Sequence, residues 1–193
     1  KEVTAIKGGT VNDAIVSASP FKGLINPLLY VDSGDGTLVD LAFAQLFDFD
    51  ANQRIKKDGG MMEFTLDREN KTVTLKLRSK DYKWSDGQPL TIDDYIFTYE
   101  FIGRKDYEGV RYDENAENIV GMKDFHEGKA DKISGLEKVD DQTVKIHLEE
   151  VYPALEMGGG AIFGQMIPKH VFKDMSYQDA VKSDKSRTDV VGN

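Results

Sequence analysis

Residues 82–100 read YKWSDGQPLTIDDYIFTYE, and this stretch decides the fold because a strand end, a tight turn and a helix start follow one another without spare residues. Asp86 and Gly87 favour a turn, since glycine readily adopts the positive φ that tight turns require. Thr91 and, three residues later, Asp94 have the spacing of a capping box. The stretch therefore predicts a helix that begins directly after Thr91.

Trp84, the only tryptophan of the chain, lies between the predicted strand and the turn. A large aromatic side chain at such a place anchors a core or a hairpin more often than it stacks on a ligand. Pro89 restricts φ to about −65° where the chain leaves the turn. We therefore assign an architectural role to a motif that comprises Trp84, Asp86, Gly87, Pro89, Thr91 and Asp94.

Two stretches in which apolar and polar residues alternate predict β-hairpins. The first hairpin spans 62–77 and turns at 67–71, and the second spans 136–148 and turns at 140–142. Strict alternation indicates that each hairpin buries one face and exposes the other. We expect both hairpins to share one antiparallel sheet.

Apolar residues at helical spacing predict helices over 38–46, 92–102 and 116–125, and a shorter one over 154–157 before a glycine triplet that indicates a hinge or a close backbone approach. The polar residues 182–187 are expected to be mobile. Hairpins and helices together predict an α+β fold class, in which an antiparallel sheet is covered by helices.

Composition excludes several classes of function. The chain has 193 residues, of which 34 are acidic and 25 basic, so its formal net charge of −9 argues against nucleic acid as a partner. The absence of cysteine excludes disulfides and thiolate sites. No apolar run approaches the ~20 residues of a membrane span, so the chain itself is expected to be soluble.

Catalytic and metal sites lack the necessary spacing. The three histidines, His126, His147 and His170, are too far apart in sequence to form a helical metal pair, and no cysteine completes a site. Neighbouring carboxylates at 93–94 and 140–141 suit a cap and a turn, and adjacent side chains point in different directions. We expect no metal, no cofactor and no enzymatic activity, and an acid-pair hydrolase is the weakest alternative.

The motif at 82–100 closely resembles the W-S-D-G-x-P-L-T-x-x-D segment of the family 5 extracellular solute-binding proteins. Further resemblances follow in the family's order along the chain. They are GGT at 8–10, INPLLY at 25–30, TLKLR at 74–78, ISGLEKVDDQTV at 133–144 and IPKH at 167–170. One departure is IKKDGG at 55–60, where the family usually has P-x-[LV]-A-x-x-W.

The resemblance implies a fragment of a periplasmic-binding-protein-like type II receptor. Residues 1–35 would then belong to the main ligand-binding lobe, 36–175 to an accessory α+β domain, and 176–193 to the start of the return to the main lobe. The family continues after the segment that VVGN at 190–193 resembles. We therefore expect an N-terminal portion of a longer protein whose leader and lipid-modified cysteine lie upstream of Lys1.

The function that the resemblance implies is capture of extracellular oligopeptides for a bacterial ABC importer, in a cleft between two lobes. The expected partners are an oligopeptide ligand and a membrane permease. The expected protein is monomeric and lipid-anchored on the outer face of the membrane, in a Gram-positive cell. Residue-by-residue transfer selects as ligand-binding candidates Tyr30, Val31, Asp32, Ser33, Val110, Arg111 and Tyr112.

Two alternatives remain open at the level of the sequence. Both candidate loops fit the description of ordinary surface turns equally well. The acidic surface could also recruit a protein partner, which would make the chain a cell-surface interaction module that binds no small ligand.

Overall fold

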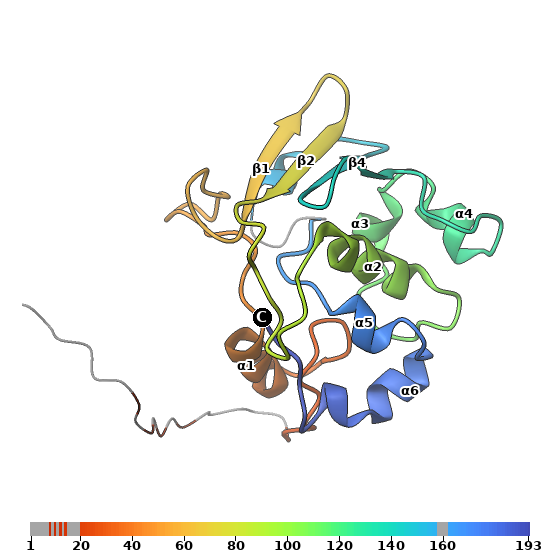
Figure 1. Ribbon diagram of the computed structural model, residues 1–193. Helices are drawn as coiled ribbons and strands as arrows, with labels where there is room; N and C mark the ends of the chain where they lie inside the picture. The colour runs from red at the N-terminus through yellow and green to blue at the C-terminus, as the bar shows by residue number, and fades with distance from the viewer. Residues whose placement is uncertain (1–7, 9, 11, 13, 15–19, 158–161) are drawn as a thin grey trace, which may run out of the picture.

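The upper part of the molecule in Figure 1 is a four-stranded antiparallel sheet. The computed structural model describes residues 8, 10, 12, 14, 20–157 and 162–193. The strands follow the order β1-β2-β4-β3, with bounds β1 Met62–Asp67, β2 Thr72–Leu77, β3 Leu136–Lys138 and β4 Thr143–His147. The α+β fold class and the single sheet predicted from the two hairpins are confirmed.

The register of the sheet places apolar residues opposite one another. In the first hairpin Phe64 faces Leu75, and across the centre of the sheet Val73 faces Ile146. Leu75, Val73 and Ile146 are fully buried. The alternation read from the sequence therefore describes the face of the sheet that packs into the core.

Helix α2, which spans Ile92–Gly103, is buried on nearly every side. It contacts β3 and β4 of the sheet and also the short helices α4 and α5. The apolar stripe from which this helix was predicted consists of Ile92, Ile96, Tyr99 and Ile102. Tyr95 lies outside this stripe and is nevertheless fully buried, as is Tyr99. A helix with neighbours on several sides buries apolar side chains on more than one face, so a single stripe describes only part of its contacts.

The remaining helices are short and surround α2 and the sheet, with α1 and α6 at the opposite end of the molecule from the sheet (Figure 1). Among the described residues no helix has both the length and the apolar character needed to cross a bilayer. The bounds are α1 Ser33–Ala42, α3 Glu114–Glu117, α4 Met122–His126, the 3₁₀ turn η1 Pro153–Glu156, α5 Lys169–Phe172, α6 Tyr177–Lys182 and the 3₁₀ turn η2 Asp184–Ser186.

The helix predicted over 38–46 begins and ends earlier, since α1 covers Ser33–Ala42. Its start is fixed by Asp35, whose buried carboxylate accepts backbone N–H groups of the segment 22–24. At the predicted end Leu46 donates its N–H to the carbonyl of Gly164 and accepts the N–H of Met62, so it cannot be helical. Long-range partners override the local spacing here.

The helix predicted over 116–125 is two helices, α3 and α4. Between them Val120 donates its N–H to the carbonyl of His147, and Gly121 adopts a φ of 79°. The backbone between the two helices therefore extends the edge of the sheet. The helix predicted over 154–157 is the single 3₁₀ turn η1.

The expectation of a mobile segment at 182–187 is wrong. Ser186 is fully buried, and its carbonyl accepts the N–H of Ile25 at 2.8 Å. Arg187 donates to the carbonyls of Val181 and Lys22. The polar side chains therefore connect two ends of the chain that lie far apart in sequence.

Two sequence features lie outside the described residues, namely the glycine triplet at 158–160 and most of the segment around the GGT motif at 8–10. The division into 1–35, 36–175 and 176–193 stays a prediction. One hydrophobic core includes residues of all three segments, among them Leu28, Trp84 and Val191.

Candidate functional site

The carboxylate of Asp94 connects the strand end at Trp84, the helix start at Thr91 and the distant residue Lys169. This carboxylate accepts the Nε1–H of Trp84 at 3.1 Å and the backbone N–H groups of Thr91 at 3.0 Å and Lys169 at 2.8 Å. Burial raises the pKa of Asp94, while these three hydrogen bonds favour its charged form. Trp84 itself is only 2% exposed. This junction leaves no room for a ligand on Trp84 and supports an architectural role.

The turn before α2 is closed by local hydrogen bonds. Gly87 has a φ of 88°, and its N–H donates to the carbonyl of Trp84 at 2.8 Å. Pro89 forms an isolated antiparallel bridge across the turn. On the surface Asp86 lies 2.7 Å from Nε2 of His170, and this hydrogen bond holds the pKa of Asp86 below its usual value. The turn is thereby attached to α5.

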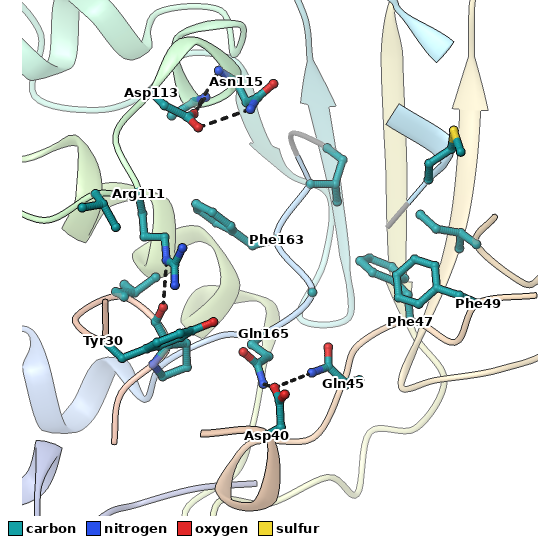
Figure 2. A pocket seen from close by; sticks show the side chains of 18 residues that line it. Tyr30, Asp40, Gln45, Phe47, Phe49, Arg111, Asp113, Asn115, Phe163 and Gln165 are labelled. Carbon is teal, nitrogen blue, oxygen red and sulfur yellow. Dashed lines mark hydrogen bonds between the residues drawn. The ribbon is translucent and has the colours of Figure 1, made fainter. Parts of the chain in front are cut away.

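A pocket of about 390 Å³ lies between the loop that precedes α1, the loop that precedes α3 and the segment after the glycine triplet (Figure 2). This volume falls within the range of roughly 300–1,000 Å³ that is usual for ligand pockets. Its wall consists of Pro27, Leu28, Tyr30, Asp40, Gln45, Phe47, Phe49, Ile55, Val110, Arg111, Asp113, Asn115, Ala116, Met157, Ile162, Phe163, Gly164 and Gln165.

The loop that carries Tyr30 is fixed by Asn26. The buried side-chain oxygen of Asn26 accepts the N–H of Leu28 at 2.9 Å, and the backbone carbonyl of Asn26 accepts the N–H of Tyr30 at 3.2 Å. An asparagine followed by a proline favours such a turn. The INPLLY segment therefore presents Tyr30 to the pocket from a well-ordered turn.

Arg111 lies against this loop from the other side of the pocket. Its guanidinium carbon is 4.5 Å from the centre of the Tyr30 ring, and its Nε donates to the carbonyl of Pro27 at 3.2 Å. Figure 2 shows the guanidinium directed into the pocket between Tyr30 and Phe163. Stacking and a hydrogen bond together fix both the position and the orientation of the cation.

The floor of the pocket carries a carboxylate and two amides. Oδ1 of Asp40 accepts a hydrogen bond from Nε2 of Gln45 at 3.0 Å and another from Nε2 of Gln165 at 3.1 Å (Figure 2). Gln165 also donates to the carbonyl of Phe43. These groups place polar side chains beside the aromatic wall.

Phe163 forms the aromatic wall and is attached to α2. Its ring stacks on that of Tyr99 with centres 4.7 Å apart, and its N–H donates to the hydroxyl of Tyr99. Burial raises the pKa of Tyr99 to about 12, so this hydroxyl stays protonated at neutral pH. Tyr95 donates its own hydroxyl to the carbonyl of Phe163.

Three of the seven ligand-binding candidates, namely Tyr30, Val110 and Arg111, line the pocket together. The other four do not. Val31 is 61% exposed, and Asp32 forms an ion pair with Lys22. Ser33 begins α1, and Tyr112 stacks on His126 with ring centres 4.0 Å apart.

The pocket also contains residues that the sequence did not single out, chiefly Asp40, Gln45, Phe49, Phe163 and Gln165. They come from segments more than 100 positions apart, so no local pattern connects them. The glycine triplet at 158–160 indicated a hinge or a close backbone approach, and this did not single out Phe163 or Gln165. Nothing in the spacing placed that loop opposite Tyr30.

The three histidines have separate surroundings. His126 contacts the carbonyl of Gly103, His147 lies 2.8 Å from Glu137, and His170 pairs with Asp86. No group of metal-ligating side chains that could hold an ion occurs among the described residues.

Comparison with known proteins identifies the class of protein to which this fold belongs. Among solved structures, lactococcal OppA, complexed with an endogenous peptide in the closed conformation, has a TM-score of 0.82 and 34% identity, over 91% of this chain and 33% of that protein. CtaP, an ABC transporter substrate-binding protein of Listeria monocytogenes, has a TM-score of 0.63 and 30% identity, over 92% of this chain and 31% of CtaP. The fold is therefore that of a substrate-binding protein of the solute-receptor class.

The sequence places the chain within that class. Residues 61–193 match the family described as bacterial extracellular solute-binding proteins, family 5, middle part. The oligopeptide-binding protein OppA of Lactococcus lactis subsp. cremoris (strain SK11) is 38% identical over 182 residues, which are 92% of this chain and 29% of that relative. The chain belongs to the family 5 extracellular solute-binding proteins, and it spans under a third of the length of this relative.

Proposed function

We propose that the chain forms one side of the ligand cleft of an oligopeptide-binding receptor that serves a bacterial ABC importer. The observation that carries the proposal is the fold and sequence similarity to lactococcal OppA, which was solved with an endogenous peptide bound. The pocket wall adds support, because aromatic side chains and polar groups converge on one concavity.

The ligand would be an extended peptide. Extended peptides are held through main-chain hydrogen bonds, while roomy pockets accept their side chains. The pocket beside Tyr30 and Phe163 suits a side chain or a chain end of such a ligand. Tyr30 to Ser33 and the loop of Val110 to Tyr112 stay the candidate contact segments, with Tyr30, Val110 and Arg111 now the preferred residues.

The receptor would act without catalysis, as a monomer that delivers peptide to a membrane permease. A lipid anchor on the outer face of a Gram-positive cell belongs to the same proposal. The family to which the chain belongs is extracellular by description, which supports this location. The domain division 1–35, 36–175 and 176–193 is likewise part of the proposal.

The test is retention of peptide by the receptor that contains this chain. The receptor is incubated with a mixture of random oligopeptides, and the peptides that remain bound are identified by mass spectrometry. One identified peptide is then titrated by calorimetry into the receptor and into the 193-residue chain alone. We expect tight binding to the receptor and very weak binding to the chain alone, since a closing cleft needs contacts from both sides.

A pair of variants tests the place of binding. Val110→Trp fills the pocket from an exposed position, and Val139→Trp makes the same change on an exposed valine outside it. We expect only Val110→Trp to weaken binding. Equal affinities of both variants would contradict the pocket, micromolar binding by the isolated chain would contradict the two-sided cleft, and retention of no peptide would contradict the proposed function itself.

A further inference from the structure

Two arginines of this chain stack on aromatic rings, and they differ in what their terminal nitrogens do. Arg104 lies 5.2 Å from the centre of the Phe101 ring, and its Nη1 and Nη2 both donate to backbone carbonyls. Arg111 stacks on Tyr30 and donates through Nε to Pro27. In the described part of the chain, no hydrogen bond or ion pair uses Nη1 or Nη2 of Arg111.

The nearby acidic groups are already engaged by other partners. Oδ1 of Asp40 accepts the two glutamine amides at the floor of the pocket. Asp113 is the N-cap of α3, and its carboxylate accepts two backbone N–H groups and the side-chain amide of Asn115. Neither carboxylate neutralises Arg111, so the pocket presents a half-buried cation with two free donors.

The cation is held firmly in this position. The hydroxyl of Tyr107 donates to the carbonyl of Leu28 at 2.7 Å and accepts the backbone N–H of Arg111 at 3.3 Å. Burial raises the pKa of Tyr107 well above its usual value, so the hydroxyl keeps its proton. A guanidinium that is fixed before the ligand arrives loses little conformational freedom on binding.

We propose that Arg111 binds a carboxylate of the ligand through Nη1 and Nη2, as a bidentate pair. The planar fork of a guanidinium matches a carboxylate in geometry and charge. The carboxylate would come from an acidic side chain of the peptide or from its C-terminus. The inference rests on the proposed peptide-binding function and adds to it a preference for an anionic group at this pocket.

The charges of the pocket disfavour more than one negative charge on the ligand group. Among the described residues of the wall, Arg111 is the only cationic one, and Asp40 and Asp113 are the acidic ones. One guanidinium can neutralise one carboxylate. A doubly charged phosphate would leave a net negative charge beside two carboxylates.

The experiment uses the receptor that contains this chain and a peptide that the receptor retains and that carries one glutamate and a free C-terminus. Two further peptides replace the glutamate by glutamine or the C-terminal carboxylate by an amide. We expect one of the two neutral replacements to weaken binding by about 10- to 100-fold. The affected peptide identifies the source of the carboxylate.

The protein variants assign the effect to Arg111. In the Arg111→Gln receptor, the neutral peptide should bind as tightly as the peptide with the carboxylate, so the loss of affinity should disappear. In the Arg104→Gln receptor, which lacks the other stacked arginine, the loss of affinity should remain. Arg111→Lys retains the charge without the fork and should show an intermediate loss. If Arg111→Gln fails to fold by circular dichroism, Arg111→Lys alone decides.

Three results have different meanings. Equal binding of all three peptides to the unchanged receptor would overturn the carboxylate inference and leave the proposed function intact. A loss that is undiminished in Arg111→Gln or in Arg111→Lys would place the carboxylate elsewhere and overturn the inference as well. Failure of the receptor to bind any peptide would overturn the proposed function on which the inference rests.

Discussion

The junction around Trp84 and Asp94 and the pocket wall around Tyr30 and Arg111 are built from the same kinds of group, an aromatic ring, a charged side chain and a loop. In the junction each N–H that reaches Asp94 comes from the protein itself. In the pocket Nη1 and Nη2 of Arg111 have no hydrogen-bond partner among the described residues, although Nε donates to Pro27 and the guanidinium stacks on Tyr30. Buried polar groups that the fold satisfies stabilise the fold, whereas the unused donors of the half-buried Arg111 are available to a ligand.

The largest effect expected from this comparison is that of Trp84→Ala. Truncation removes a fully buried ring and leaves Asp94 with one hydrogen bond fewer, so the free energy of unfolding should fall by about 3–5 kcal/mol. Chemical denaturation of the chain measures the change, and Phe21→Ala, at an aromatic residue that is 58% exposed, is the control. Retained stability combined with lost peptide binding in the receptor would make Trp84 a ligand platform and reverse the comparison.

Asp94→Asn should have the second largest effect. The amide keeps the size of the carboxylate but presents an N–H₂ group to donors, so we expect a loss of about 2 kcal/mol. The control is Asp93→Asn at the neighbouring position, where the half-exposed carboxylate pairs with Lys138 and the loss should stay within about 1 kcal/mol. Equal losses for the two variants would show that the three hydrogen bonds of Asp94 add nothing.

The effect of Asp94→Asn has a defined pH dependence. Burial raises the pKa of Asp94 above 3.8, so the folded protein binds a proton at a higher pH than the unfolded chain does. The resulting stabilisation is fully present below pH 3.8 and is lost as the pH rises through the pKa of the folded state. Denaturation at several pH values should therefore show the difference between wild type and Asp94→Asn growing in acid. A constant difference would contradict the raised pKa.

The two regions also differ in how far they could be predicted from the sequence. The junction lies within 82–100, where the turn, the cap and the helix start are local features, and the hairpins follow from alternation. Even here the bond from Lys169 to Asp94 could not be foreseen, because it joins residues 75 positions apart. Local chemistry predicts the elements and leaves their partners open.

The pocket is built almost entirely from such long-range partners. Tyr30 and Arg111 could be selected by resemblance, but Phe163 and Gln165 face them only because the chain returns after the glycine triplet. Tyr112 was also selected by resemblance, but it stacks on His126 and does not line the pocket. In an irregular loop the sequence does not show which side chains face the pocket, because this depends on the long-range contacts of the loop.

Thr91→Ala sharpens the description of the junction with a small effect. The N–H of Thr91 bonds to the carboxylate of Asp94, and alanine keeps that N–H. We therefore expect a loss of about 0.5 kcal/mol, at the low end of N-cap substitutions. The matched variant is Ser176→Ala at α6, where the serine hydroxyl itself accepts the N–H of Asp179, and its loss should be the larger one. A larger loss at Thr91 would assign the cap to the threonine hydroxyl.

Gly36→Ala has the smallest expected effect on stability and tests the pocket side. A Cβ at Gly36 would lie 2.9 Å from Cε2 of Tyr30, so the ring must move. The gain in helix propensity in α1, up to about 1 kcal/mol, offsets the cost of that movement, and the net change in stability should be close to zero. Because Arg111 stacks on the same ring, displacement of Tyr30 should weaken peptide binding by the receptor.

The control for Gly36→Ala is Thr37→Ala, which raises helix propensity at an exposed position of α1 and should leave binding unchanged. Calorimetry with a retained peptide measures affinity, and chemical denaturation measures stability, for both variants. If Gly36→Ala binds peptide as well as Thr37→Ala does, the position of the Tyr30 ring does not matter to the ligand. The pocket wall would then have an architectural role, as the Trp84 junction does. The stacking of Arg111 on Tyr30 would stabilise the fold without contributing to ligand binding.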